Sequence, residues 1–442
     1  MSYPEQRHAA KVDRIARQLR ARTPGKPVSL RKKAVAHQVP KHGDLRRYDE
    51  KIDVSDLTEV LSIDPDARLC VAESGVTFVD LVRATLAYGL VPVVVPELKT
   101  ITIGGAVAGC SIESMSFVYG SFHDACTAYE VITGRGDVMT VTPDGEHALV
   151  FQMMMGAFGT LGIVSKLTFK LVPAKPFVRL AYESHATLET YLASIKAHAA
   201  ARDVDFMDGI IHSPRKYVLS LGTFVDTAPY TSDYSWLRVY WESTGTRRED
   251  YLATPDYFFR YDRGVTNVRP SSLPGRLVFG KLLTSTQWLK LGNKLHWVLA
   301  RENPTVTVDL FLPVSRAPEF LSWYERELDF YPLWCVPYRR VRDYEWLAPR
   351  FYAGHTDDLF LDLAVYGMRQ HGKRAGAHRK IEEKLMELGG IKTLISHNYY
   401  SEDEFWSIFN RGNYDAVKRI TDPDNAFRDL YTKTCRTAMG LR

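Results

Sequence analysis

The sequence predicts an α+β protein with more than one domain, and three observations carry this prediction. Residues 8–20 place apolar side chains at helical spacing, whereas residues 163–173 alternate apolar and polar side chains as a half-exposed strand does. Short strand-like runs and helix-like runs then recur along the whole chain. Its 442 residues are enough for two or three domains with a large core.

The N-terminal part begins with a basic amphipathic helix, and Pro and Gly make residues 23–50 read as irregular. Two short strands are expected around residues 57–63 and 68–72. They are followed by a helix for which Gly89 fits the C′ position. A hairpin of residues 128–133 and 138–142 comes next, and then a short apolar helix and the strand 163–173.

Residues 177–392 predict a second α+β region. Its strand candidates are "KYVLSLGTFV", "NPTVTVDLFLP" and "DLFLDLAVYG", and its helix candidates span residues 318–328 and 373–388. The "PAKP" stretch marks a boundary before it, and the tail after residue 391 is mixed. We therefore divide the chain into an N-terminal basic helix (1–22), a first domain (23–175), a cap domain (176–392) and a C-terminal segment (393–442).

Composition and charge exclude several classes of protein. The sequence shows no signal peptide, and its most apolar stretch, residues 148–164, is too short and too rich in glycine to span a membrane. Five scattered cysteines favour reduced thiols over a disulfide framework or a zinc site. The sequence contains no metal-ligand spacing of histidines and no Walker loop, GxSxG or GxGxxG motif. These absences disfavour a hydrolase, a kinase or a metalloenzyme. We expect a cytoplasmic protein.

Two glycine clusters, "TIGGAVAGCSIES" and "GAFGTLGIV", are the main chemical signal. Loops of glycine and small hydroxyl residues expose successive backbone N–H groups, which bind pyrophosphate without a lysine. Glycines that only permit tight turns would give the same pattern, so the residues alone leave both readings open.

The order of "TIGGAVAGCSIES", "YG", "YEV" and "GTLGIV" resembles the FAD-binding PCMH-type (vanillyl-alcohol-oxidase-type) oxidoreductases. "VVPELKTITIGGAV", "LFLDLAVYG" and "EDEFWSIFNRGNYD" are similar to one branch, the Δ24-sterol reductases and the bacterial methylene-fatty-acyl reductases. The resemblance implies a two-subdomain FAD-binding fold with an α+β cap over the flavin. It places the pyrophosphate and flavin against Thr102, Gly104, Gly105, Gly109, Cys110, Ser111, Glu113, Ser114, Tyr119 and Gly120, and the adenosine half near Gly159, Thr160, Gly162 and Ile163.

One region departs from the family pattern. Where relatives carry an earlier glycine-rich phosphate loop, often with a histidine that bonds the flavin, this chain reads "VSLRKKAVAHQVPKHG". We expect Lys32, Lys33 and Lys41 to supply positive charge there in place of N–H groups. An ordinary role for His37 is favoured over a covalent link, so we predict non-covalent FAD.

The resemblance implies reduction of a lipid C=C bond with NADPH as electron source. An isolated alkene has no carbonyl to polarise, so the site needs a positioned acid and aromatic rings that stabilise positive charge. The candidates, placed by the same resemblance, are Tyr399, His397, Tyr338 and Tyr366. Two alternatives stay open: a flavin oxidase or dehydrogenase of a CH–OH group, and a non-enzymatic flavin- or lipid-binding protein.

The expected partner is a small lipid substrate. Residues 14–51 are strongly basic within a chain of net charge +5, and nothing resembling a nucleic-acid module accompanies them. Such a segment suits peripheral contact with an anionic membrane, although a solvated basic face would read the same way.

Overall fold

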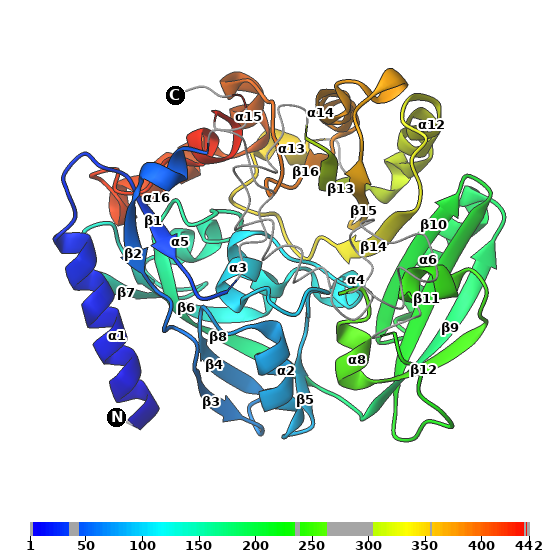
Figure 1. Cartoon of the computed structure of the whole chain (residues 1–442), viewed down its shortest axis with the longest axis horizontal. Helices are drawn as coiled ribbons and strands as arrows, with labels where there is room; N and C mark the ends of the chain where they lie inside the picture. Colours follow the sequence, from blue (N-terminus) through cyan, green and yellow to red (C-terminus); the bar gives the residue numbers. More distant parts are fainter. Residues whose placement is uncertain are drawn as a thin grey trace, which may run out of the picture.

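The computed structural model describes residues 3–34, 44–234, 239–262, 304–353, 356–436 and 439. His37 and Lys41 lie outside the described residues. Two large sheets organise the described chain, a six-stranded sheet in the N-terminal half and an eight-stranded sheet after residue 176 (Figure 1). Helices are spread between and around both sheets. The α+β prediction is confirmed.

The six-stranded sheet is built around its longest strand, β8 (Ile163–Pro173). Leu167 and Phe169 of β8 are buried while Lys170 is exposed, which confirms the predicted alternation. The expected hairpin is also confirmed, since β6 and β7 pair antiparallel. The order is β3-β4-β8-β6-β7, with β5 also on β8. The remaining strands are β3 (Val60–Asp64), β4 (Leu69–Glu73), β5 (Leu90–Pro92), β6 (Cys126–Ile132) and β7 (Val138–Val141).

Short helices cover this sheet and connect its strands. The predicted position of Gly89 is wrong by one residue: Ala87 is the C-cap of α2 (Phe78–Leu86), so Gly89 lies one position beyond C′. The N–H groups of Tyr88 and Gly89 bond three residues back, which tightens the last turn before Gly89 takes its positive φ. The other helices are α3 (Ile103–Ala108), α4 (Ser116–Tyr119), η2 (Phe122–Ala125) and α5 (Ala148–Met153), the last being the expected short apolar helix.

The basic helix is present as α1 (Tyr3–Arg20), but the reading of residues 23–50 as wholly irregular is wrong. This segment contains β1 (Val28–Arg31), which pairs parallel with β2 (Glu50–Asp53), and the 3₁₀ turn η1 (Leu45–Tyr48). Val28 also bridges Phe427, near the other end of the chain. Because β1 is held by partners distant in the sequence, it does not need alternating apolar and polar residues of its own, and the sequence pattern did not predict it.

The eight-stranded sheet has the order β12-β9-β11-β10-β14-β15-β13-β16, and every pair within it is antiparallel. All three strand candidates are confirmed, as β11, β13 and β15. The strands are β9 (Phe177–His185), β10 (Phe206–Ser213), β11 (Lys216–Val225), β12 (Glu249–Ala253), β13 (Val306–Pro313), β14 (Leu333–Arg339), β15 (Leu359–Met368) and β16 (Ile391–Lys392). The chain passes from β8 of the first sheet to β9 of the second near residue 175, where we keep the domain boundary as a proposal.

The two faces of this second sheet have different neighbours. One face packs its apolar side chains, such as Val308, Leu310 and Leu363, against α6 (Leu188–Ala201), α12 (Ala317–Glu327) and α14 (Ala377–Leu388). The opposite face, with Phe311, Trp334, Tyr338 and Phe360, shares an apolar core with the six-stranded half. We call this second surface the inner face of the cap sheet. Because side chains alternate along a strand, the neighbours of the helix-facing residues lie on it.

The helices of the second half fit the prediction with one changed boundary. The predicted helix 318–328 is α12, whereas the helix expected over 373–388 starts only at Ala377. Gly376 precedes it in a left-handed conformation, and residues 372–374 form a separate 3₁₀ turn, η4 (Gly372–Arg374). The smaller helices are α7 (Tyr240–Thr244), α8 (Thr254–Phe258), η3 (Val314–Arg316) and α13 (Pro349–Tyr352).

The C-terminal segment crosses back to the N-terminal half, where its orange and red helices lie beside β1, β2 and α5 in Figure 1. It comprises α15 (Glu402–Ile408), α16 (Arg411–Thr421) and a π-helical turn, η5 (Thr432–Arg436). Lys418 of α16 fixes this return, since its ammonium donates to the carbonyls of Thr160 (2.9 Å) and Phe427 (2.7 Å). Lys433 of η5 thereby comes close to the second glycine cluster.

Two expectations about composition can be compared with the described residues. Within them, no helix has the length and apolar character needed to cross a membrane. All five cysteines are free thiols, four of them buried and Cys110 half-buried.

Candidate cofactor and substrate site

The first glycine cluster forms the N-terminal turn of the short helix α3. Thr102 is the N-cap, and its hydroxyl accepts the N–H of Gly105 at 3.2 Å. The N–H of Gly104 donates to the carbonyl of Ser74 at 2.9 Å. The expectation that this turn offers successive free N–H groups to a pyrophosphate is therefore wrong, because the protein itself satisfies them.

The two adjacent glycines have different surroundings. A Cβ at Gly104 would lie 2.7 Å from the Cβ of Ser74, so this glycine permits close packing of two segments. A Cβ at Gly105 would have only the Thr102 hydroxyl within 4 Å, at 3.1 Å, and open space beyond it. Gly105 is thus the position of this turn that a ligand can approach.

The residues that follow α3 turn the chain sharply twice. Gly109 is the C-cap of α3, and Cys110 adopts a left-handed conformation with φ of 58°. The backbone of Ser111 then bonds to Ala106 on one side and Phe122 on the other. Gly120 has φ of 78°, and a Cβ there would lie 2.6 Å from the carboxylate of Asp124. Tyr119, beside it, keeps 37% of its surface exposed.

Glu113 and Ser114 join this stretch to the cap domain. The Glu113 carboxylate lies 3.3 Å from the guanidinium of Arg260, which also contacts Asp208 of β10 at 3.1 Å. Tyr257 donates its hydroxyl to Ser114 at 3.0 Å. All five side chains are buried, so this network fixes the two domains against each other. The predicted flavin contacts of Glu113 and Ser114 stay proposals.

The second glycine cluster forms the turn between α5 and β8. Gly159 and Gly162 have φ of 68° and 138°, conformations that favour glycine. Thr160 is fully buried and donates its hydroxyl to Ala157 at 2.6 Å, while Ile163 starts β8 inside the core. The Thr160 and Ile163 side chains hold the turn, and the open position is Gly159, where an added Cβ would meet only the Lys433 ammonium at 3.9 Å.

Three cations gather at this turn. Lys433 of η5 donates to the carbonyl of Phe158 at 2.6 Å. Burial, followed by the charges of Arg46 and Lys32, lowers the pKa of Lys433 to about 7. The pKa of Lys32 is lowered for the same two reasons, burial and Arg46, although its side chain remains accessible.

The acids Asp44 and Asp49 only partly offset this positive charge at Lys433. Cations that depress one another's pKa are typical of a site that receives an anion. Lys32 was expected here from the sequence, whereas Lys433 and Arg46 were missed. No sequence signal could have found Lys433, because 275 positions separate it from the Phe158 carbonyl that it binds.

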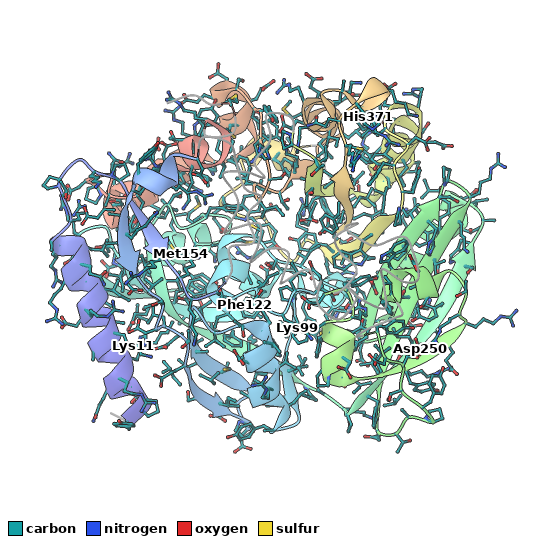
Figure 2. The ribbon with its side chains drawn as sticks, viewed as in Figure 1. Lys11, Lys99, Phe122, Met154, Asp250 and His371 are labelled. Carbon is teal, nitrogen blue, oxygen red and sulfur yellow. The ribbon has the colours of Figure 1, made fainter. Side chains whose placement is uncertain are left out.

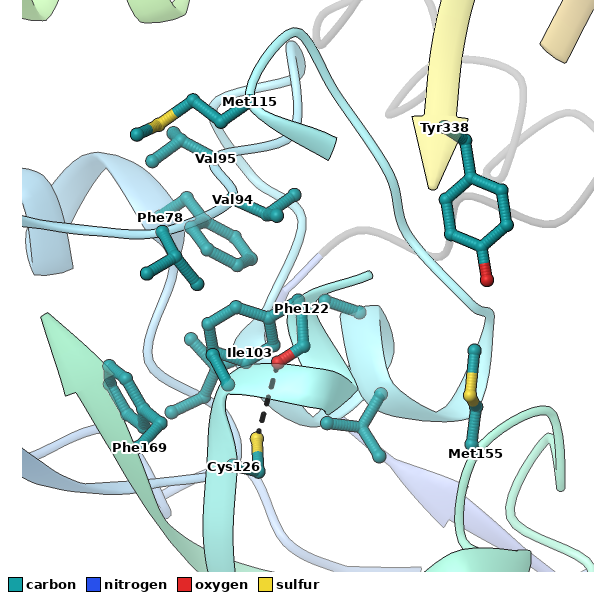
Figure 3. Close-up of a cluster of buried hydrophobic side chains, with 14 of the residues drawn as sticks. Phe78, Val94, Val95, Ile103, Met115, Phe122, Cys126, Met155, Phe169 and Tyr338 are labelled. Atoms are coloured by element: carbon teal, nitrogen blue, oxygen red, sulfur yellow. Dashed lines mark hydrogen bonds between the residues drawn. The ribbon is translucent and has the colours of Figure 1, made fainter. Parts of the chain in front are cut away.

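The inner face of the cap sheet brings aromatic and acidic side chains together. Two of the predicted catalytic residues, Tyr338 of β14 and Tyr366 of β15, lie on it. Figure 3 shows Tyr338 reaching from its strand toward the α3 side of the molecule, with its hydroxyl turned toward Met155. That hydroxyl donates to Tyr344, which in turn donates to Asp124 at 2.9 Å. Tyr366 donates to the carboxylate of Asp309 at 2.5 Å.

The other two predicted catalytic residues, His397 and Tyr399, lie beside α14. The rings of both lie near the His378 ring in tilted arrangements, with centroids 5.8 and 5.7 Å away. Tyr399 also donates its backbone N–H to Glu382 at 3.0 Å, and His397 is only 3% exposed. The four candidates thus form two pairs, one on the inner face and one in the loop after β16.

Comparison with known proteins adds the family context. Residues 26–142 match the model of the FAD binding domain. The chain is 26% identical over 431 residues to a Δ24-sterol reductase homolog of Caenorhabditis elegans, covering 88% of this chain and 79% of that protein. It is 26% identical over 407 residues to the human Δ24-sterol reductase, covering 86% and 77%. A decaprenylphosphoryl-β-D-ribose oxidase of Mycolicibacterium smegmatis is 33% identical over 125 residues, covering 28% and 27%. The resemblance stated from the sequence is confirmed.

The residues of the site fit FAD. Its diphosphate carries two negative charges and would meet the cluster of Lys32, Arg46 and Lys433, whose positive charge Asp49 and Asp44, the ion-pair partner of Arg46, only partly offset. An added Cβ at Gly105 or Gly159 would meet only one side chain, Thr102 or Lys433, so the backbone of both turns can be approached. The described residues show no group of His, Cys, Asp and Glu that could hold a metal ion.

Proposed function

We propose that this chain is an FAD-dependent reductase of a carbon–carbon double bond in a lipid, with NADPH as the electron source. The observation that carries the proposal is the extent of its similarity to the Δ24-sterol reductases. The similarity covers 86–88% of the chain and so includes the cap as well as the FAD-binding part. Within this proposal, the substrate is a sterol or a lipid with a methylene-bearing acyl chain.

Bound FAD would supply hydride chemistry at the flavin ring. Lys32, Arg46 and Lys433 would bind its diphosphate, and the open backbone at Gly105 and Gly159 would let it approach. The inner face of the cap sheet would cover the reaction site and exclude water. Its rings, among them Phe311, Trp334 and Phe360, suit an apolar substrate and stabilise positive charge that develops on it.

The test follows the two half-reactions of the purified full-length protein. Its visible spectrum should show bound flavin, and anaerobic NADPH should bleach it. A sterol with a side-chain double bond, or a phospholipid with a methylene-bearing acyl chain, should then restore the oxidised spectrum and yield the saturated lipid. A protein that holds no flavin, or a reduced flavin that neither lipid reoxidises, contradicts the proposal.

A second candidate is an oxidase or dehydrogenase of a CH–OH group. It is supported by the match to the oxidase of M. smegmatis, which has the higher identity but covers only 28% of this chain. An alcohol or sugar that bleaches the flavin without NADPH, in a protein that no lipid alkene reoxidises, would select this candidate.

A further inference from the structure

Two carboxyl groups without a role in the proposed reaction lie together on the inner face of the cap sheet. Asp309 is in β13 and Asp362 in the adjacent strand β15, where Asp309 pairs with Ala364 and Phe311 pairs with Asp362. The two acids are therefore diagonal neighbours, and both side chains point away from the helices that cover the other face.

Each of these carboxyl groups has neutral hydrogen-bond donors. Asp309 accepts the hydroxyl of Tyr366 at 2.5 Å on Oδ1, and Asp362 accepts the backbone N–H of Leu310 at 3.1 Å. Within the described part of the chain, no Lys, Arg or His lies within ion-pair distance of either carboxyl group. This contrasts with Asp208, an acid of the same face that contacts Arg260.

A third acid, Glu97, belongs to the same group. It follows β5 and is 9% exposed. Burial, then the charges of Asp309 and Glu113, raises the pKa of Glu97 to about 8, against the opposing effect of Arg260. Burial also raises the pKa of Asp309, and burial together with the charge of Asp309 raises that of Asp362. Like charges this close in a buried site cannot all ionise, so the group retains at least one proton at neutral pH.

The members of this acid group differ in exposure. Asp309 and Tyr366 are half-buried, whereas Asp362 is only 4% exposed. The Tyr366 hydroxyl donates to Oδ1 of Asp309, and Thr393 is a second hydrogen-bond partner of this carboxyl group. Asp309 is therefore the member of the group placed to deliver a proton to a bound molecule.

We propose, resting on the proposed function, that Asp309 is the acid that protonates the lipid alkene and that Tyr366 positions its carboxyl group. One alkene carbon receives a hydride, whose two electrons come from NADPH by way of the flavin. The other carbon takes the proton of Asp309, so the C=C π bond and the O–H bond break while two C–H bonds form. The charge that Asp309 then carries raises the pKa of its neighbours Asp362 and Glu97, which therefore keep their own protons. A solvent proton then restores the carboxyl group of Asp309.

The test is Asp309→Asn, which keeps the shape of the side chain and removes the transferable proton. We expect normal FAD content and normal flavin reduction by NADPH. Reoxidation of the reduced flavin by the lipid alkene should slow by about 100-fold or more, the usual contribution of a general acid. Asp226→Asn, at an exposed acid after β11, makes the same chemical change and should leave all three measurements unchanged.

A second readout does not depend on turnover. Infrared spectra of the holoprotein at about pH 5 should show the carbonyl bands of buried protonated carboxyl groups. The contribution of Asp309 should be missing in Asp309→Asn and shifted in Tyr366→Phe. The groups that face Asp309 are Asp362 and Tyr366 of β15, Thr393 after β16 and Glu97 after β5. Burial raises the pKa of Asp309 to about 6, so its contribution to the carbonyl signal should fade as the pH rises through that value, while those of Asp362 and Glu97 persist. If Asp309→Asn fails to fold, Asp309→Glu keeps the carboxyl group and should retain the band with a slower alkene step.

The outcomes separate this inference from the function on which it rests. Wild-type turnover together with normal reoxidation in Asp309→Asn overturns the inference alone, as does an infrared band that the substitution leaves intact. A wild-type protein that reduces no lipid alkene overturns the proposed function and the role of Asp309 with it. If only the role of Asp309 is overturned, His397 and Tyr399 are the next candidates for the proton donor.

Discussion

Gly104 and Gly105 are neighbours in the sequence, yet a side chain would clash with Ser74 at Gly104 and would meet only the Thr102 hydroxyl at Gly105. The Gly104 N–H and its missing side chain both serve contact with Ser74. Gly105 lies one residue further along the first turn of α3 and faces away from that contact. At the scale of single residues, the glycine pair thus combines a packing role with a ligand-facing role.

The two roles predict opposite results for matched substitutions. Gly104→Ala should destabilise the folded protein by about 1–3 kcal/mol, the usual cost of an overpacked site. Gly105→Ala should leave the free energy of unfolding of the apoprotein unchanged or slightly higher, because alanine favours a helix, and should weaken FAD binding. Urea denaturation and flavin titration of both variants check this. If Gly104→Ala and Gly105→Ala changed stability and FAD affinity by equal amounts, the separate roles of the two glycines would be contradicted.

Lys433 gives a second prediction at this scale. Lys433→Met should weaken FAD binding by about 10- to 100-fold, the loss expected for one charged hydrogen bond. Lys175→Met, at an exposed lysine paired with Asp226, is the control and should bind FAD normally.

The pKa of Lys433 also predicts a proton linkage. In the apoprotein this pKa is lowered to about 7, and a diphosphate beside it favours the charged form, which raises the pKa. FAD binding between about pH 7 and pH 9 should therefore take up a proton. Calorimetry in two buffers with different ionisation enthalpies measures this uptake. An uptake that persists in Lys433→Met would rule out this lysine as its source.

At the scale of elements, α1 shows how a basic amphipathic helix can be used inside the molecule. Lys11, labelled in Figure 2, donates to Glu59 at 2.7 Å and to Glu73 at 2.9 Å. Buried in the same interface, His8 bonds Glu73 at 2.9 Å and Glu130 at 2.8 Å. Much of the positive charge that α1 shows in the sequence therefore holds the helix on the six-stranded sheet.

His8 makes the stability of this interface depend on pH. Burial opposes its ionisation, but the hydrogen bonds to Glu130 and Glu73 outweigh burial and raise its pKa. A group whose folded pKa is raised stabilises the protein fully below its unfolded pKa, about 6.5. That stabilisation is lost as the pH rises through the folded pKa. His8→Gln should cost about 3 kcal/mol at pH 6 and less at pH 9.

Urea denaturation of the wild type and of His8→Gln between about pH 6 and pH 9 measures this difference in the free energy of unfolding. The exposed His371, labelled in Figure 2, provides the control variant His371→Gln, which should match the wild type at every pH. A cost of His8→Gln that does not change with pH would mean that His8 stabilises α1 only by packing.

At the scale of the whole molecule, the ion pairs of α1 bear on the proposed membrane contact. Arg7, Lys11 and Arg14 are paired with acids of the six-stranded half, which leaves less basic charge for a membrane than the sequence suggested. Lys26 and Lys33, which follow α1, are exposed. Membrane contact stays a proposal, and these two lysines are the part of the basic segment best placed for it.

We predict that the protein binds vesicles containing anionic lipid and that added salt weakens the binding. The double substitution Lys26→Gln and Lys33→Gln should reduce this binding by about 30-fold, at about 1 kcal/mol for each lysine near the surface. Sedimentation with vesicles measures both effects. Binding to neutral vesicles that equals binding to anionic ones would overturn the proposal.

The sequence by itself determined the features that depend on neighbouring residues. Alternation predicted β8, helical spacing predicted α1 and α12, and the motif order identified the FAD-binding part. These signals are local, because side-chain period and turn chemistry act over a few positions. Boundaries such as the start of α14 were less certain for the same reason, since one left-handed glycine moved it.

Only the tertiary structure decided which side chains meet. Lys433 reaches Phe158 across 275 positions, and Asp309 gains Tyr366 and Asp362 through the pairing of β13 with β15. The charge of α1 was visible in the sequence, but its use depended on acids that the fold brings to it. Electrostatic effects depend on distance and burial in space, and neither is written in local sequence.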